Sequence, residues 1–193
     1  FFQGQPKQAL EAVESIVKDD PNDNNSLALR AAMQLQSGDA DKSSAAINDL
    51  QALLGKAPQN PAIRYNLARA YQARGDLDAA RVQYAEAVKQ RRDFLAAYIG
   101  LGQVALMKQD FGRAIEAADS VLRFDQKNIP ARVIKVNGLL NSGNVILARQ
   151  EVDKFLAETP EQPDLRFQQA LVFFMEKKHT DAERVFRSLR ERY

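Results

Sequence analysis

No cysteine occurs among the 193 residues, which excludes disulfide bonds and thiolate metal sites and leaves the redox compartment open. Tryptophan is also absent, and histidine occurs once, as His179. The sequence contains no His-x-x-x-His pair and no glycine-rich phosphate loop. His179 and the acidic pairs fall in turns or near predicted helix ends, where capping explains them. We therefore expect no enzymatic activity, no cofactor and no metal site.

Neither a strong charge nor a long apolar run is present. The chain carries 27 Lys and Arg against 25 Asp and Glu, for a net charge of +2. Such a balance gives no electrostatic footprint for nucleic acid or anionic membranes. No apolar stretch approaches the ~18 residues that cross a bilayer, so we expect no direct membrane insertion. The hydrophobic share of 45% is typical of a globular protein.

A short turn sequence repeats at a constant interval along the chain. The six residues from Gly75 to Ala80 recur at Gln109–Ala114, Gly143–Ala148 and, more weakly, Lys177–Ala182, each time 34 residues further on. Upstream, Gly38 opens the same turn 37 residues before Gly75. The extra three residues predict one longer helix between these two turns. An interval of 34 residues built from paired helices is typical of the tetratricopeptide repeat.

Small residues recur at two slots of this interval. The first predicted helix of a repeat carries Ala68, Gly102 or Ala170, and the second carries Ala80, Ala114, Ala148 or Ala182. Small side chains allow helix axes to approach to about 8–10 Å. Large residues such as Tyr71, Tyr84 and Phe155 lie between them on the same apolar stripes. The pattern predicts closely crossed helix pairs.

The segment from Asn66 through Tyr71 and Gly75-Asp76 to Ala80 and Tyr84 resembles the tetratricopeptide repeat (TPR) family, and the resemblance extends over nearly the whole chain. It implies an all-α fold, an α-α superhelix of about eleven antiparallel-paired helices. Lys135, Lys177 and Ser43 depart from the family pattern. The segment Gly4–Ala9 is similar to bacterial TPR lipoproteins encoded with exopolysaccharide and protein-sorting systems, which favours the cell envelope or periplasm over the cytoplasm.

The predicted organisation is a single array over residues 1–193. Its parts are the second helix of a truncated repeat at 5–22 and five repeats at 24–60, 61–94, 95–128, 129–162 and 163–193. Neither end carries the polar capping helix that usually closes a solenoid. We therefore expect a piece of a longer array, whose exposed terminal repeats favour homo-oligomers.

The predicted function is a protein-interaction scaffold that binds a peptide or helix of an unidentified partner. In TPR arrays the first helix of each repeat lines a concave groove. Carrying over these groove positions from the resemblance gives Tyr65, Arg69, Gln72, Ile99, Gln103, Leu106, Met107, Val133, Asn137, Leu140 and Asn141. Amide side chains could bond a peptide backbone, and the apolar positions could accept its side chains.

Several alternatives stay open on the sequence. The array could be a structural, self-assembling solenoid that holds no peptide. Phe167, Phe174 and Met175 could line the groove or pack against a following repeat. The arginines of the last helix could form a solvated face or contact an acidic partner. The positions flanking Asn66 do not match the groove clamp that holds chaperone carboxyl termini, and the near-neutral charge disfavours RNA-binding repeat classes.

Overall fold

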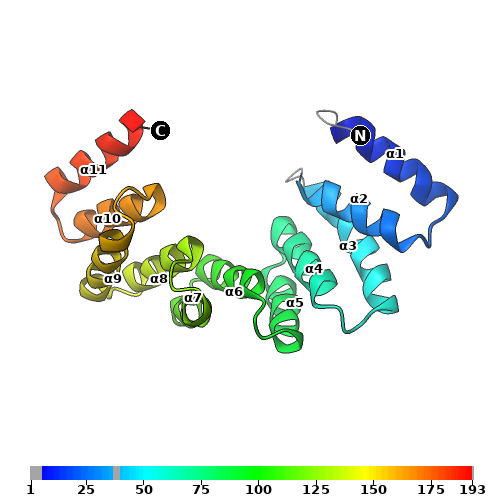
Figure 1. Ribbon diagram of the computed structural model, residues 1–193, viewed down its shortest axis with the longest axis horizontal. Coiled ribbons are helices and arrows are strands. Elements are labelled where there is room, and N and C mark those ends of the chain that lie inside the picture. Colours follow the sequence, from blue (N-terminus) through cyan, green and yellow to red (C-terminus); the bar gives the residue numbers. More distant parts are fainter. Residues whose placement is uncertain (1–5, 37–39, 193) are drawn as a thin grey trace. The chain divides into compact units, whose positions relative to one another are not determined.

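The computed structural model describes residues 6–36 and 40–192, and this part of the chain is built from helices joined by short turns (Figure 1). The helices are α1 (Pro6–Asp19), α2 (Asn24–Gln36), α3 (Ala40–Lys56), α4 (Pro61–Arg74), α5 (Leu77–Gln90), α6 (Leu95–Met107), α7 (Phe111–Phe124), α8 (Ile129–Asn141), α9 (Val145–Glu158), α10 (Pro163–Met175) and α11 (His179–Arg192). The all-α prediction is confirmed. The predicted long helix is α3, with 17 residues against 13 or 14 in the others.

Two compact units divide the chain at Gly100, one over Phe1–Gly100 and one over Leu101–Tyr193. In the first unit α2 packs on α3, α3 on α4 and α4 on α5, and α2 also touches α4. In the second unit α8 packs on α7, α9 and α10, and α10 packs on α11. The first helix of a repeat therefore contacts both its own partner helix and the first helix of the next repeat.

Capping residues start several of these helices where the sequence changes from turn to apolar stripe. The Asn60 side chain accepts bonds from the backbone N–H groups of Ala62 and Ile63, at 3.0 and 3.3 Å, and Pro61 occupies the first helical turn of α4. Asn128 caps α8 in the same way, with its Oδ1 3.1 Å from the Ala131 nitrogen. These bonds satisfy N–H groups that a helix start otherwise leaves unpaired.

The turn inside a repeat has one backbone conformation that does not depend on glycine. Gly75 and Gly143 have φ of 89° and 81°, in the left-handed region that glycine enters at no steric cost. Gln109 and Lys177, which occupy the same slot in the other two repeats, also have positive φ, at 58° and 61°. Lys177, one departure from the family pattern, thus keeps the turn geometry without the glycine.

The small residues at the two predicted slots are buried between helices. Ala68, Ala80, Ala114, Ala148, Ala170 and Ala182 all belong to the core. A Cβ placed on Gly102 would lie 2.9 Å from a methyl carbon of Ile134 on α8. A Cβ on Gly100 would lie 2.3 Å from the ring of Tyr84 on α5. Close helix packing, as predicted, explains these residues.

Arginine side chains hold the loops between repeats, an arrangement that the sequence analysis missed. Arg64, Arg132 and Arg166 occupy one slot of the repeat, and each donates to the backbone carbonyl six residues before it. The donor–acceptor distances are 2.9 Å to Pro58, 2.8 Å to Gln126 and 2.7 Å to Pro160. Each of these bonds fixes the first helix of a repeat to the loop that leads into it.

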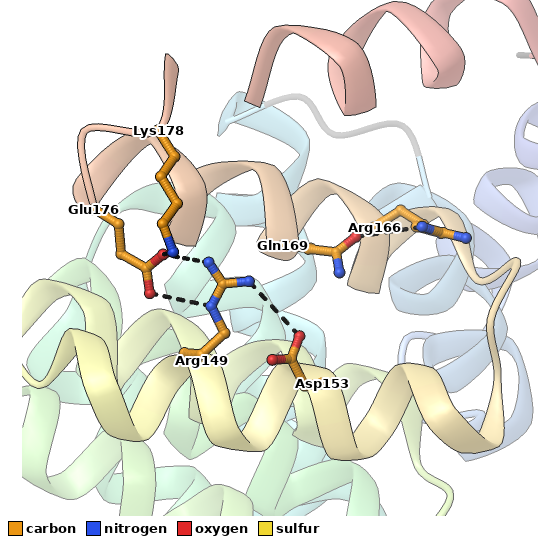
Figure 2. Close-up of polar contacts among 6 residues, drawn as sticks. All are labelled: Arg149, Asp153, Arg166, Gln169, Glu176 and Lys178. Atoms are coloured by element: carbon orange, nitrogen blue, oxygen red, sulfur yellow. Dashed lines mark hydrogen bonds and ion pairs between the residues drawn. The ribbon is translucent and has the colours of Figure 1, made fainter. Parts of the chain in front are cut away.

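A second arginine contact joins α9 to the end of α10 (Figure 2). Arg149 makes a two-bond contact with Glu176, with its Nε 3.1 Å from Oε1, and Lys178 lies 2.9 Å from the same carboxylate. The Arg149 guanidinium also stacks over the Phe173 ring at 4.2 Å. The hydrogen bonds from Arg149 hold the pKa of Glu176 below its ordinary value.

Candidate peptide-binding recess

Four of the predicted groove residues lie together in the second unit. Leu106 and Met107 at the end of α6, and Asn137 and Asn141 on α8, line a recess of about 550 Å³. Gln109 and Phe111, from the turn into α7, complete its lining. The left-handed Gln109 allows the sharp exit from α6, since the next residue, Asp110, bonds back to the Ala105 carbonyl at 2.8 Å. This turn places Phe111 at the start of α7 beside α8.

The recess combines an apolar part with two amide side chains. Met107 is 55% exposed, while Leu106 and Phe111 are half-buried. The Asn141 amide nitrogen donates to the Asn137 backbone carbonyl at 2.8 Å, which fixes the orientation of that side chain along α8. The Asn141 carboxamide oxygen and the Asn137 side chain have no partner among the described residues. They can therefore bond a peptide backbone laid across the recess, while the Met107 thioether, Leu106 and the Phe111 ring accept peptide side chains.

Leu140, another of the predicted groove residues, does not line this recess. It is only 5% exposed and lies in the hydrophobic cluster that also contains Leu165 and Val172. The physical reason is that α10 packs on α8 and covers this position. Val133 is half-buried and packs against the same cluster, whereas Gln103 is exposed on α6 outside the recess lining.

The predicted groove residues of the first unit mainly hold α4 to its neighbours. The Tyr65 ring lies 5.8 Å from that of Tyr84 and 5.0 Å from that of Phe94. The Tyr84 hydroxyl donates to the Gln72 side chain at 2.9 Å, and burial raises the pKa of Tyr84. Arg69 is exposed, with its guanidinium 5.9 Å from the Tyr65 ring centre, and Ile99 on α6 is half-buried.

Phe111 and Gln109 belong to the recess although the sequence analysis did not assign them there. Both residues were assigned only to the repeating turn sequence Gln109–Ala114. Their position directly after the left-handed turn is the feature that could have identified them, because this turn brings the start of α7 beside the first helices.

Among the described helices none is long and apolar enough to cross a membrane.

Comparison with known families matches this architecture. Two models of the tetratricopeptide repeat match residues 1–61 and 34–103, which together cover more than half of the chain. The chain is a tetratricopeptide repeat protein. A search of curated proteins gave no match.

Solved TPR structures are similar to this TPR chain over most of its length. A TPR protein from Parabacteroides merdae superposes with a TM-score of 0.84 at 19% identity, covering 97% of this chain and 73% of its own. Residues 41 to the end of MamA from Desulfovibrio magneticus RS-1 give a TM-score of 0.75 at 15% identity, covering 88% and 94%. A thermophilic TPR protein from Thermus thermophilus gives 0.66 at 21% identity, covering 89% and 92%. At these identities the likeness concerns the fold alone.

Proposed function

We propose that this TPR protein is a non-enzymatic interaction scaffold that binds an extended peptide of a partner protein in the recess between α6 and α8. The observation that carries the proposal is the pairing of exposed Met107 with the two asparagines Asn137 and Asn141 around one hollow. TPR domains generally serve as protein-interaction scaffolds, and the family membership supports a protein partner. The identity of the partner and the cell-envelope location stay predictions.

Peptide binding in this recess divides into two parts. The apolar floor of Leu106, Met107 and Phe111 would take one large side chain, for which the flexible thioether can adapt its shape. Asn137 and Asn141, one turn apart on α8, would bond the adjacent peptide backbone, which gives affinity independent of sequence. A single hollow of this size fits a few residues, so we expect micromolar rather than nanomolar affinity.

Selection from a displayed peptide library, followed by affinity measurement on variants, tests this proposal. Met107→Glu puts a charge into the apolar part, and we expect it to weaken the selected peptides by about tenfold or more. Ile146→Glu is the matched control, because Ile146 is 74% exposed and lies on α9 outside the recess lining. Asn137→Ala should weaken all selected peptides to a similar degree. Peptides that bind the wild type and both recess variants equally would place the binding surface elsewhere.

Self-association is the second candidate function, and the exposed apolar residues of α10 favour it. Phe174 is 54% exposed, and Phe167 and Met175 are also exposed among the described residues. Sedimentation velocity over a wide range of protein concentration measures the association. Phe174→Glu should abolish a dimer formed through α10, whereas Met107→Glu should leave it intact. A concentration-independent monomer would eliminate this candidate.

A further inference from the structure

A second hollow lies on the opposite side of α8, among charged residues of α7, α8 and α9. Its volume is about 450 Å³, in the range of small-ligand sites. The lining residues are Asp119, Leu122, Arg123, Gln126, Arg132, Lys135, Glu151, Lys154, Phe155 and Glu158. Arg132 and Lys135 lie on the face of α8 away from Asn137 and Asn141, as the 3.6-residue helical period requires. The two hollows of the second unit are therefore separate.

The three carboxylates of this hollow are already paired. Lys135, which departs from the apolar residue of the family pattern, places its ammonium 3.0 Å from Asp119 and 2.8 Å from Glu151. Burial lowers the pKa of Lys135, but these two hydrogen bonds outweigh it and the pKa is raised overall. Glu158 is bonded to Arg132, and this bond lowers the pKa of Glu158. Lys135 and Glu158 are thus charged at neutral pH.

In contrast, not every hydrogen-bond donor of the lining residues has an acceptor. Arg132 is 1% exposed, and its Nε donates to the Gln126 carbonyl while one terminal nitrogen bonds Glu158. Its other terminal nitrogen, Nη1, is buried with no hydrogen-bond partner among the described residues. Leaving a charged group's donor unpaired in the interior is costly. Because Arg132 lines the hollow but its side chain is almost fully covered, an acceptor can reach this donor only when a covering side chain moves.

Two further cations line this hollow without an ion pair among the described residues. Arg123 bonds only the Ser120 hydroxyl, at 3.0 Å, and Lys154 has no ion pair in the described part of the chain. Four cations against three paired carboxylates leave the lining with one net positive charge. Phe155 lies under the Arg132 guanidinium at 4.6 Å and holds it in place. The unpaired donor, the already paired carboxylates and the net positive charge of the lining all favour the binding of an anion.

We propose that the hollow between α7, α8 and α9 binds an oxyanion, a carboxylate or phosphate group that completes the hydrogen bonding of Arg132 and pairs with Arg123 and Lys154. Arginine and lysine bind both groups through charge-assisted hydrogen bonds, with arginine offering two parallel donors. The group could belong to a small free anion or to an acidic segment of a protein. In either case the site is independent of the peptide recess on the other face of α8.

Titration followed by NMR at constant ionic strength tests the proposal. The probes are inorganic phosphate, citrate and an acetylated triglutamate amide, with chloride as the balancing anion. We expect saturable shifts of the Arg132 and Arg123 side-chain resonances together with amides of α7 and α9. Arg123→Gln and Lys154→Gln should each lower the affinity about threefold, and the double variant about tenfold. Arg113→Gln is the matched control, because Arg113 is also an exposed arginine of α7 but lies outside the lining.

The order of affinities among the three probes distinguishes a protein-borne carboxylate from a free anion, and two other outcomes would reject the site. Tighter binding of the glutamate peptide than of citrate and phosphate indicates a protein-borne carboxylate, and the reverse order indicates a free anion. Linear, unsaturated shifts with every probe, or an equal loss of affinity in Arg113→Gln, would overturn the site and leave Arg132 as a loop-holding residue only. The Met107→Glu variant should bind the anion normally, so failure of the peptide recess does not affect this result.

Discussion

Two glycine-to-alanine changes in helices should shift stability in opposite directions. An alanine normally stabilises a helix interior by about 0.5–1 kcal/mol relative to glycine, because it loses less backbone entropy. Gly112, in the first turn of α7, has no neighbouring atom within 4 Å of the position that an alanine Cβ would take, so Gly112→Ala should gain this amount at most. Gly100→Ala would gain the same term but would meet the Tyr84 ring at 2.3 Å.

The Tyr84 ring cannot move aside at low cost. It is 2% exposed, its hydroxyl is bonded to Gln72, and its ring contacts that of Tyr65. Forcing extra atoms into such a packed position costs about 1–3 kcal/mol, which exceeds the helix-propensity gain. We therefore expect Gly100→Ala to be destabilised by about 1–2 kcal/mol net.

Urea unfolding followed by far-UV circular dichroism measures both variants against the wild type. The pair controls for helix propensity, since the same substitution is made in both helices and only the contact differs. A Gly100→Ala protein as stable as the Gly112→Ala protein would refute the packing of Tyr84 on α6.

Two further predictions concern the left-handed turn within a repeat and the loss of stability at low pH. Lys177→Gly should stabilise the protein by up to about 1 kcal/mol, because glycine removes the cost of the left-handed backbone at this turn. Gly75→Ala should destabilise it by about 1–2 kcal/mol in the same urea assay. A loss of stability in Lys177→Gly would contradict backbone strain at Lys177. The pKa of Glu176 is lowered from 4.5 by Arg149, so its contribution to stability is complete above pH 4.5 and is lost as the pH falls through the folded-state pKa. Glu176→Gln should therefore be less stable than the wild type at neutral pH, and the difference should shrink under acid, as thermal unfolding at a series of pH values will measure; a difference that grows under acid would show the opposite linkage.

The fold could be predicted because the same residue types recur at the same positions of successive repeats. Ala80, Ala114, Ala148 and Ala182 recur at one interval, and each packs where two helices cross. Even Lys177 kept the predicted turn, since the packing of the flanking helices fixes the backbone there more strongly than the residue type does.

The site could be predicted only in part because exposure depends on the neighbouring repeat. Met107 and Leu140 both occupy groove positions by counting, but α10 covers Leu140 and leaves Met107 open. In α1 two adjacent apolar residues differ in the same way, because the structure buries Val17 and leaves Ile16 largely exposed. Where two apolar residues of similar size are adjacent, the sequence does not indicate which of them faces the neighbouring helix.

The arginine that holds the loops before α4, α8 and α10 is missing before α6, and this bears on where a protease would cut. The third repeat carries Tyr98 at the slot of Arg64, Arg132 and Arg166, so the loop before α6 lacks the arginine bond that these three residues make. That loop contains Arg91 and Arg92, both exposed. A trypsin-like enzyme needs a basic residue in a segment that can leave its helices, and exposed loops with few backbone contacts are where nicking concentrates. The loop after α5 has the basic residues and lacks the arginine contact, although the Phe94 N–H still donates to the Arg91 carbonyl at 3.1 Å. We therefore expect limited trypsin digestion to cut this loop before the loops that lead into α4, α8 and α10.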